Sequence, residues 1–366
     1  MRVLVVNAGS SSVKVGVVEG GDRLGPHADL GAPGADMADR LGEFVEGAGT
    51  LDAAGHRIVH GGARFRESVL LDATSRGELA GLAALAPLHN PPALAAVERL
   101  EQVCPGLASV ACFDTAFHAG MPAEASSYAL PAEWVTRWGI RRYGFHGLSC
   151  TWAVGRAAQL LGWPANRGRL VVCHLGAGAS ATAVADGRSV DTTMGFTPME
   201  GLVMATRPGD VDPGVISWLL AHGVRLDELE DALQHRSGLA ALSGDAGGDM
   251  RVVLERRGAG SGPAGDAVGV YLHRLRGKIA AMAAAMGGLD ALVFTGGIGE
   301  NSTVVRAETC AGLGWLGVAI DEGANDRAAG HDGDISAAGV TVPTVVVRAR
   351  EDLVIAAECH RLLSTS

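Results

Sequence analysis

Four polar residues in separate parts of the chain combine the side chains that phosphoryl transfer to an anion requires. Arg57, Asp114, His146 and Arg207 each lie in a short segment flanked by strand-like or turn-like sequence. Taken singly, each is explained as structure, because a buried histidine usually satisfies a carbonyl and a single arginine usually pairs with an acid. Together, two cations, an imidazole and a carboxylate can neutralise and orient two anions that must react. Such a set needs elements that bind phosphate beside it.

Two hairpins with small polar tips are the first such elements. Residues 2–19 hold a β-branched run, a Gly-Ser turn and a second run in which valine recurs at every other position, the period of a strand. Residues 169–191 repeat this plan with a Gly-Ala-Gly tip and a later Asp-Gly turn. The repeat predicts two similar domains, each opening with a hairpin whose tip presents backbone N–H groups to phosphate oxygens.

Nucleotide sites of two common kinds are disfavoured. Residues 176–181 match the pattern G-x-G-x-x-A, but a dinucleotide site of that kind requires a helix next, and here a strand-like run and an Asp-Gly turn follow. The chain also has no G-x-x-x-x-G-K-[ST] run. Phosphate binding would therefore use another fold.

A third glycine cluster completes the candidate framework. Residues 289–294 predict a buried strand, which is followed by a glycine turn over 295–301 and a helix over 302–310, a backbone that a nucleotide could approach closely. Apolar residues at helical spacing predict a core helix over 265–286. A strand is expected over 340–347 and a closing helix over 351–363. Residues 20–49, rich in Gly, Ala, Asp and Pro, are expected to be a surface insertion.

Composition limits the class of protein. At about 150 residues per domain, 366 residues predict two domains, and 48% hydrophobic with 19% charged residues predict a folded chain. The net charge of −10 and the absence of a basic block argue against nucleic acid as a partner. No apolar run is long enough for an export signal or a membrane span. The six cysteines show no C-x-x-C pair, which favours reduced thiols in a cytoplasmic protein.

An ordered series of motifs resembles the acetate/propionate kinase family. The motifs run in the family's order along nearly the whole chain, which makes the resemblance highly specific. They are Asn7-Ala-Gly-Ser-Ser-Ser-Val-Lys14, His56-Arg-Ile-Val-His-Gly-Gly62, Pro87-Leu-His-Asn90, Phe113-Asp-Thr-Ala-Phe-His118, Tyr143-Gly-Phe-His-Gly147, Thr197-Pro-Met-Glu-Gly201, Thr206-Arg-Pro-Gly-Asp210 and Thr295-Gly-Gly-Ile-Gly-Glu-Asn301.

The resemblance implies an α/β fold with two duplicated βββαβαβα domains, ribonuclease H-like and of the actin/hexokinase type, around an ATP cleft. We expect an N-terminal domain over 1–118 with a closing helix over 352–366, and a nucleotide-binding C-terminal domain over 119–351. The implied reaction is the ATP-dependent phosphorylation of a short-chain carboxylate, foremost acetate, by direct in-line transfer to give acetyl phosphate and ADP. The family also implies a homodimer.

Site residues are carried over by the same resemblance. Asn7 and Glu351 would hold Mg²⁺, with Mn²⁺ as the alternative. Arg57 and Arg207 would bind the carboxylate and the transferred phosphoryl group, His146 would stabilise the transition state, and Asp114 would be the catalytic aspartate. The apolar acid pocket would contain Val59, Leu88, Phe145 and Pro198. ATP or ADP would contact Ser10, Ser12, Lys14, His174, Leu175, Gly176, Ala177, Gly178, Asp249, Met250, Arg251, Gly297, Ile298, Gly299, Glu300 and Asn301.

The chemistry of the acceptor limits what Asp114 can do. A carboxylic acid with a pKa near ~4.3 is already an anion at pH 7, so it needs no general base. The obstacle is repulsion between two anions, which fixed guanidinium groups and Mg²⁺ can neutralise. We therefore expect Asp114 to orient a metal or an arginine rather than to accept a proton.

Departures from the family's pattern leave other readings open. The second hairpin carries Ala177 where the family usually has Asn, so weaker contact with the nucleotide phosphates is expected. Arg350 is a new charge beside Glu351. The alternatives are a kinase for propionate or a longer acid, a nucleotide-binding homologue that is catalytically weakened, and a sugar kinase of the same superfamily.

Overall fold

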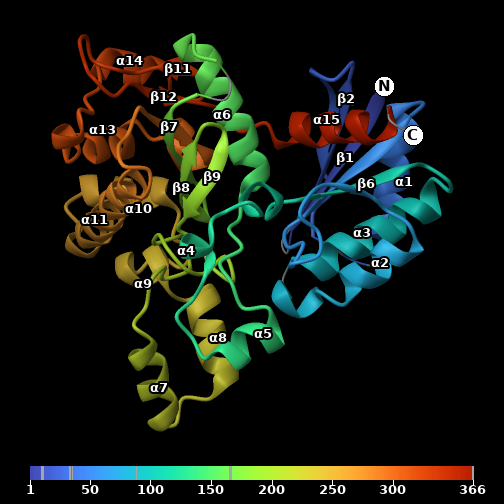
Figure 1. Cartoon of the computed structure of the whole chain (residues 1–366), viewed down its shortest axis with the longest axis horizontal. Helices are drawn as coiled ribbons and strands as arrows, with labels where there is room; N and C mark the ends of the chain where they lie inside the picture. Colours follow the sequence, from blue (N-terminus) through green and yellow to red (C-terminus); the bar gives the residue numbers. More distant parts are fainter. Residues whose placement is uncertain (10–11, 33, 35, 88, 165–166, 365–366) are drawn as a thin grey trace. The chain divides into compact units, whose positions relative to one another are not determined.

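The chain forms two compact units, each built around one sheet. The computed structural model (Figure 1) describes residues 1–9, 12–32, 34, 36–87, 89–164 and 167–364. The first unit comprises Met1–Ala119, Phe145–Trp152 and Arg350–Ser366, and the second comprises Gly120–Gly144 and Ala153–Ala349. The domains expected from the sequence, 1–118 with 352–366 and 119–351, differ in that residues 145–152 belong to the second domain. Those domain boundaries stay a prediction.

The first unit contains a six-stranded sheet of order β3-β2-β1-β4-β6-β5. Strands β1, β4 and β6 are parallel to one another, and the other three pair in antiparallel fashion. The predicted hairpin over 2–19 is confirmed, since β1 and β2 pair from Arg2↔Glu19 to Ala8↔Val13. The elements of this unit are β1 (Arg2–Ala8), β2 (Val13–Glu19), β3 (Arg23–Asp29), α1 (Met37–Ala48), β4 (Ala53–Ile58), β5 (Val69–Leu70), α2 (Ala73–Ala80), η1 (Ala83–Leu85), α3 (Asn90–Val103), β6 (Ser109–Phe113), η2 (Ala116–His118) and α15 (Glu351–Leu363).

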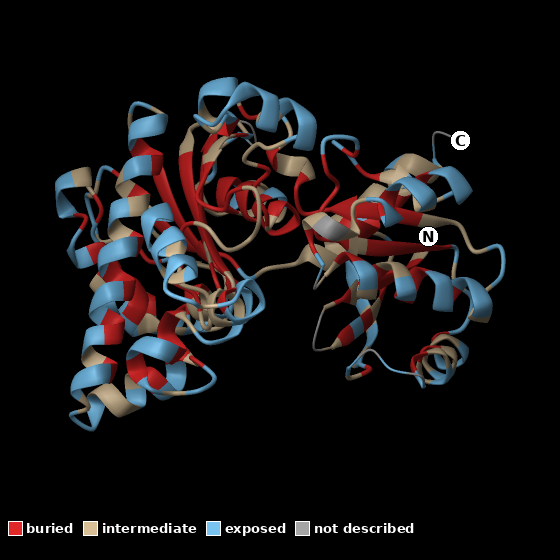
Figure 2. Ribbon diagram, turned by 90° about the horizontal axis from the view of Figure 1, so that it is seen from below, coloured by how far each residue is buried: buried red, intermediate tan, exposed pale blue. Residues whose placement is uncertain are grey.

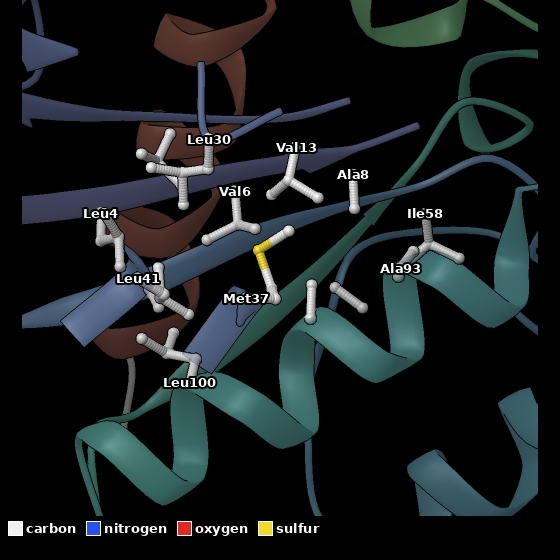
Figure 3. Close-up of a cluster of buried hydrophobic side chains, with 14 of the residues drawn as sticks. Leu4, Val6, Ala8, Val13, Leu30, Met37, Leu41, Ile58, Ala93 and Leu100 are labelled. Atoms are coloured by element: carbon white, nitrogen blue, oxygen red, sulfur yellow. The ribbon is translucent and has the colours of Figure 1, made fainter. Parts of the chain in front are cut away.

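The expectation that residues 20–49 are a surface insertion is wrong. This segment contains strand β3, which extends the sheet beside β2, and helix α1. Met37 and Leu41 lie one helical turn apart on α1, and both pack into the buried cluster shown in Figure 3. A short apolar stripe therefore outweighs the loop-like composition around it.

The second unit repeats the plan of the first. Its sheet has the order β9-β8-β7-β10-β12-β11, which matches β3-β2-β1-β4-β6-β5 strand for strand and direction for direction. This confirms the predicted duplication and the α/β fold class. Its elements are α4 (Ala123–Ser126), α5 (Ala132–Trp138), β7 (Arg169–Leu175), β8 (Ala179–Ala185), β9 (Arg188–Thr192), α7 (Pro213–Ala221), α8 (Leu226–His235), α9 (Gly238–Ser243), α10 (Met250–Gly258), α11 (Gly262–Ala285), β10 (Ala291–Thr295), α12 (Gly296–Asn301), α13 (Thr303–Ala311), η3 (Gly314–Leu316), α14 (Glu322–Arg327), β11 (Gly333–Asp334) and β12 (Thr344–Val346), while α6 (Gly147–Leu161) begins in the first unit and ends in the second.

The third glycine cluster differs from its prediction. Of residues 295–301, expected as a turn, Thr295 ends strand β10 and residues 296–301 form the short helix α12 directly after it. Gly296 makes the sharp change of direction with φ +76°, and a Cβ there would lie 2.8 Å from the carbonyl oxygen of Leu175. A single glycine thus makes the turn, and the residues after it are free to form a helix.

The core of each unit lies on the faces of its sheet. Figure 2 shows buried residues concentrated on the strands and exposed residues on the outer sides of the helices. Helix α11 confirms the predicted core helix and α15 the predicted closing helix, with Leu272, Leu275 and Ile355 buried. Five of the six cysteines are buried, and all six are free thiols. Within the described ranges, no helix combines the length and apolar character needed to cross a membrane.

Candidate functional site

The first unit gathers polar side chains at the carboxyl ends of its three parallel strands. Asn7 lies near the end of β1, Arg57 near the end of β4, and Asp114 directly after β6. The strands are in register here, since Val6 pairs with His56 and Arg57 with Cys112. Ligands of open α/β sheets bind at this edge. Residues 50 and 57 positions apart in sequence are therefore brought together by strand pairing.

Arg57 and Asp114 form a forked ion pair at the centre of this group. Nε of Arg57 donates to Oδ1 of Asp114 at 3.1 Å, and Nη2 donates to Oδ2 at 2.5 Å. Nη1 of Arg57 donates to Oδ1 of Asn7 at 3.1 Å. Burial opposes the charge of Arg57, but the carboxylates of Asp114 and Glu351 outweigh it and raise the pKa of the guanidinium. Asp114 thus orients an arginine, as its chemistry predicts.

Glu351 reaches this pair because α15 packs closely on β4 at a glycine. A Cβ at Gly55 would lie 2.2 Å from Cγ2 of Ile355, so any larger residue would push the helix away. Arg57 follows Gly55 on the same face of β4, and Glu351 precedes Ile355 by one helical turn. As a result, Oε2 of Glu351 lies 3.6 Å from Nε of Arg57.

His146 has a left-handed backbone, with φ +59°. This conformation costs a non-glycine residue on the order of 1 to 3 kcal/mol and is concentrated at functional sites. The next residue, Gly147, donates its N–H to the carbonyl oxygen of Asp114 at 2.9 Å, and a Cβ there would lie 2.2 Å from that oxygen. The structure therefore places the half-buried His146 directly beside the Asp114 segment.

The apolar residues Val59 and Phe145 are both buried, and hydrogen bonds to buried side chains hold the backbone of His60, next to Val59, and of Phe145. Asn90, fully buried, accepts from the N–H of His60 at 3.1 Å and donates to its carbonyl oxygen at 2.9 Å. The ring of His60 packs edge-on against Phe145, with centroids 5.4 Å apart. The carbonyl oxygen of Phe145 lies 2.9 Å from Nε2 of His118. Asn90 and His118 belong to the family-like motifs, but the sequence assigned neither a role; in the structure both are buried and hold the backbone beside these apolar residues.

Acid should destabilise the protein through His56 and His118. Burial lowers the pKa of each imidazole from 6.5 to about 4. The unfolded chain then binds more protons than the folded one between these pH values, so the free energy of unfolding falls as pH drops through this window and levels off below it. Each group contributes up to about 3 kcal/mol.

Urea unfolding between pH 7.5 and pH 4.5 checks this expectation. His56 lies on the core face of β4, and neither of its ring nitrogens has a hydrogen-bond partner among the described residues. His56→Leu should therefore flatten the pH dependence, whereas His235→Leu, at an exposed position, should leave it unchanged. An equally steep dependence in His56→Leu would contradict the assignment.

The second unit contains a cavity of about 820 Å³ at the corresponding sheet edge. Eight of the predicted nucleotide residues line it, namely Gly176, Ala177, Asp249, Met250, Arg251, Gly297, Ile298 and Asn301. His174, Leu175, Gly178, Gly299 and Glu300 are not among the lining residues. The cavity also involves residues that sequence reasoning missed, namely Ala205, Gly247, Gly248, Leu254, Ser302, Thr303 and Val304. The double glycine before Asp249 was the available signal, since a Cβ at Gly248 would lie 2.1 Å from the carbonyl oxygen of Ala205.

Arg207 lies in the second unit with its charge uncompensated. Its Nη1 donates to the carbonyl oxygen of Pro198 at 2.7 Å, and it makes no ion pair with any described residue. Burial lowers the pKa of the guanidinium. An anion bound to Arg207 would therefore meet a cation that no carboxylate already neutralises, in contrast to Arg57.

Sequence comparison identifies the family. The profile of the acetokinase family matches residues 35–357. The chain belongs to this family. An acetate kinase from Synechococcus sp. is 43% identical, with 99% of both chains covered. The crystal structure of Porphyromonas gingivalis acetate kinase is 34% identical, covers 99% of both chains and has a TM-score of 0.90. A propionate kinase from Francisella tularensis has the same identity and coverage and a TM-score of 0.91.

The remaining residues predicted from the acetokinase resemblance are distributed as follows. Lys14 lies on β2, exposed and paired in register with Asn7. Ser12 lies between β1 and β2, and Ser10 and Leu88 lie outside the described residues. Among the residues that the structure describes, no three His, Cys, Asp or Glu side chains form a metal cluster. Magnesium does not require one, because it is usually held by one or two carboxylates together with phosphates and water.

Proposed function

We propose that this acetokinase family member phosphorylates acetate with ATP. A carboxylate oxygen attacks the γ-phosphorus, a new P–O bond forms, and the bond to the β,γ-bridging oxygen breaks. The products are acetyl phosphate and ADP, and no proton is transferred because the acid is already ionised. The observation that carries this proposal is 43% identity to an acetate kinase along the whole chain, and the polar groups described above supply the chemistry.

The two arginines have different roles in this proposal. Arg207 has no carboxylate partner, so we assign it to the incoming anion and the charge that develops on the transferred group. Arg57 already shares its fork with Asp114 and lies near Glu351. We assign Arg57 to fixing these two carboxylates and to offering its remaining N–H groups to the substrate. His146, held in a strained backbone beside Asp114, would donate to an oxygen of the transition state.

The first unit fits the magnesium ion that ATP chemistry uses. One cation, Arg57, faces the carboxylates of Asp114 and Glu351, so the group has a net negative charge, and the amide oxygen of Asn7 adds a neutral oxygen donor. Asn7 and Glu351 would hold Mg²⁺, or Mn²⁺ in its place. The bound ion would neutralise phosphate oxygens during transfer.

A panel of acids tests the proposed function. The protein is incubated with ATP, Mg²⁺ and either acetate, propionate or butyrate, and acyl phosphate is trapped with hydroxylamine. Acetate should react with the highest kcat/KM, because each added methylene must find room beside Val59 and Phe145. Highest activity with propionate would establish the alternative that similarity to the Francisella enzyme favours. Stabilisation by ATP without any acyl phosphate would overturn both.

Ala177→Asn should strengthen nucleotide binding. Ala177 is exposed in the lining of the 820 Å³ cavity, so an amide side chain has room there and can donate to a phosphate oxygen. We expect the Kd for ADP to fall by about fivefold, which corresponds to one hydrogen bond of about 1 kcal/mol. Calorimetric titration measures it. An unchanged or higher Kd would show that the missing asparagine has no bearing on phosphate contact in this chain.

The proposal includes a homodimer that forms through α7. None of the residues of this helix is buried, and Val215, Trp218 and Leu220 are each more than 40% exposed. Apolar side chains this exposed indicate a protein interface. Light scattering should give twice the mass of one chain for the wild type. Val215→Glu with Trp218→Glu should give a monomer, and Trp315→Glu, at another exposed tryptophan, should remain dimeric. A dimeric double variant would rule out this surface.

The proposal also places the protein in the cytoplasm. Its cysteines are free thiols, which a reducing compartment maintains, and its reaction needs ATP.

A further inference from the structure

Arg306 is fully buried and forms no ion pair with any residue that the structure describes. It is the largest of the fully buried side chains, and it lies on α13, just after the third glycine cluster. Burial lowers the pKa of its guanidinium to about 10, so the group is still charged at neutral pH. A buried cation without a carboxylate is costly unless every donor is satisfied. Its hydrogen bonds therefore indicate what it is retained for.

The guanidinium donates to the carboxyl end of α12. Its Nη1 donates to the carbonyl oxygens of Gly299 at 2.8 Å and Glu300 at 2.9 Å. These carbonyls lie in the last turn of the helix, where intrahelical partners are missing. Arg306 thus caps the carboxyl end of α12 and fixes the position of that end.

Asn325 completes the contact on the other side. Nε of Arg306 donates to Oδ1 of Asn325 at 2.7 Å, and Nη2 donates to its carbonyl oxygen at 2.8 Å. The amide of Asn325 in turn donates to the carbonyl oxygen of Thr303 at 2.9 Å. The pair therefore holds the backbone at Gly299, Glu300 and Thr303, on both sides of the junction between α12 and α13.

This junction is one wall of the 820 Å³ cavity. Gly297, Ile298 and Asn301 of α12 line it, as do Ser302, Thr303 and Val304. Within this wall, Asn301 donates to the carbonyl oxygen of Gly297 at 2.8 Å, and the hydroxyl of Ser302 accepts from the N–H of Val305 at 3.3 Å. From outside the wall, the N–H of Gly330 donates to the carbonyl oxygen of Glu300 at 3.0 Å. Arg306 and Asn325 do not line the cavity themselves.

We propose that Arg306 and Asn325 are a positioning pair for the nucleotide, which hold the wall formed by residues 297–304 in its binding geometry. The inference rests on the proposed function of this cavity as the nucleotide site. A wall held to a fraction of an ångström is what close contact with a ligand requires. Without the guanidinium, its four hydrogen bonds to Gly299, Glu300 and Asn325 are lost and the junction can relax away from the nucleotide.

Nucleotide affinity tests the pair on the full-length protein. The Kd for ADP in the presence of Mg²⁺ is measured by calorimetry for wild type, Arg306→Met and Arg306→Lys, with melting temperatures from circular dichroism. Arg306→Met should raise the Kd by about tenfold or more, by analogy with residues that support a binding shell, and Arg306→Lys should give an intermediate value. The KM for acetate should stay within about twofold of the wild type, because the change concerns nucleotide binding alone.

Arg169→Met is the matched control. Arg169 makes three side-chain hydrogen bonds, to Asp290 and to the carbonyl oxygen of Gly287, but it lies at the amino end of β7, away from the cavity. It should lower the melting temperature without changing the Kd for ADP. If Arg306→Met does not fold, Arg306→Lys and Asn325→Ala are judged by the same criterion.

The outcomes separate this inference from the proposed function. Arg306 variants that melt earlier but bind ADP as tightly as the wild type would assign the pair a purely structural role and overturn the inference. An equal loss of affinity in Arg169→Met would overturn it as well, since the effect would then reflect general destabilisation. A wild-type protein that does not bind ADP would refute the nucleotide site itself.

Discussion

Arg57→Ala should lower the turnover number for acetyl phosphate formation by roughly 10²-fold or more. The substitution removes the forked ion pair with Asp114, whose side chain is only 1% exposed, and so removes the cation paired with a buried carboxylate. It also removes the donor to Asn7 and the cation beside Glu351. The two proposed magnesium ligands, Asn7 and Glu351, would lose the cation beside them, and Asp114 would lose the arginine that it orients.

A conservative variant and a surface control make the Arg57 test specific. Arg57→Lys keeps the charge but cannot form the fork, so its turnover should lie between those of wild type and Arg57→Ala. Arg236→Ala breaks the exposed ion pair with Asp231 and should have wild-type turnover. Steady-state rates are read alongside circular dichroism to confirm folding. A folded Arg57→Ala protein with near-normal turnover would remove Arg57 from the site.

Arg207→Ala should have an effect of similar size, roughly 10²-fold or more on turnover, for a different reason. Arg207 has no carboxylate partner among the described residues, so its removal leaves no buried anion behind. The loss should appear in the transition state, where charge spreads over the transferred phosphoryl group. The melting temperature should therefore change little, whereas that of Arg57→Ala should fall.

Kinetics of the Arg207 variant distinguish binding from chemistry. If Arg207 binds acetate and the transition state equally, the KM for acetate rises and kcat is kept, and if it acts in the transition state, kcat and kcat/KM fall together. We expect the second result. Arg225→Ala, which breaks an exposed ion pair with Asp227, is the matched control and should behave as wild type. An unchanged kcat in Arg207→Ala would refute the role proposed for this residue.

The sequence predicted those helices and strands whose own residues carry a regular alternation of apolar and polar side chains. The alternating valines after residue 12 form β2. Helix α15 has the bounds predicted for the closing helix, 351–363. Side chains at period 2 or 3.6 must all face one side, so these periods are visible in a single stretch of sequence. Residues 20–49 failed for the opposite reason, because β3 is stabilised by pairing with β2 rather than by a pattern of its own.

The types and order of the reactive residues were determined by the sequence alone, and so were the duplicated hairpins and the family. The tertiary structure decided which of these residues meet. Glu351 reaches Arg57 because Gly55 lets α15 approach β4. Arg306 can hold the nucleotide wall because the last turn of α12 ends within hydrogen-bond distance of its guanidinium. Such contacts join residues that are distant in the chain, and they depend on packing distances of a few tenths of an ångström that no local period encodes.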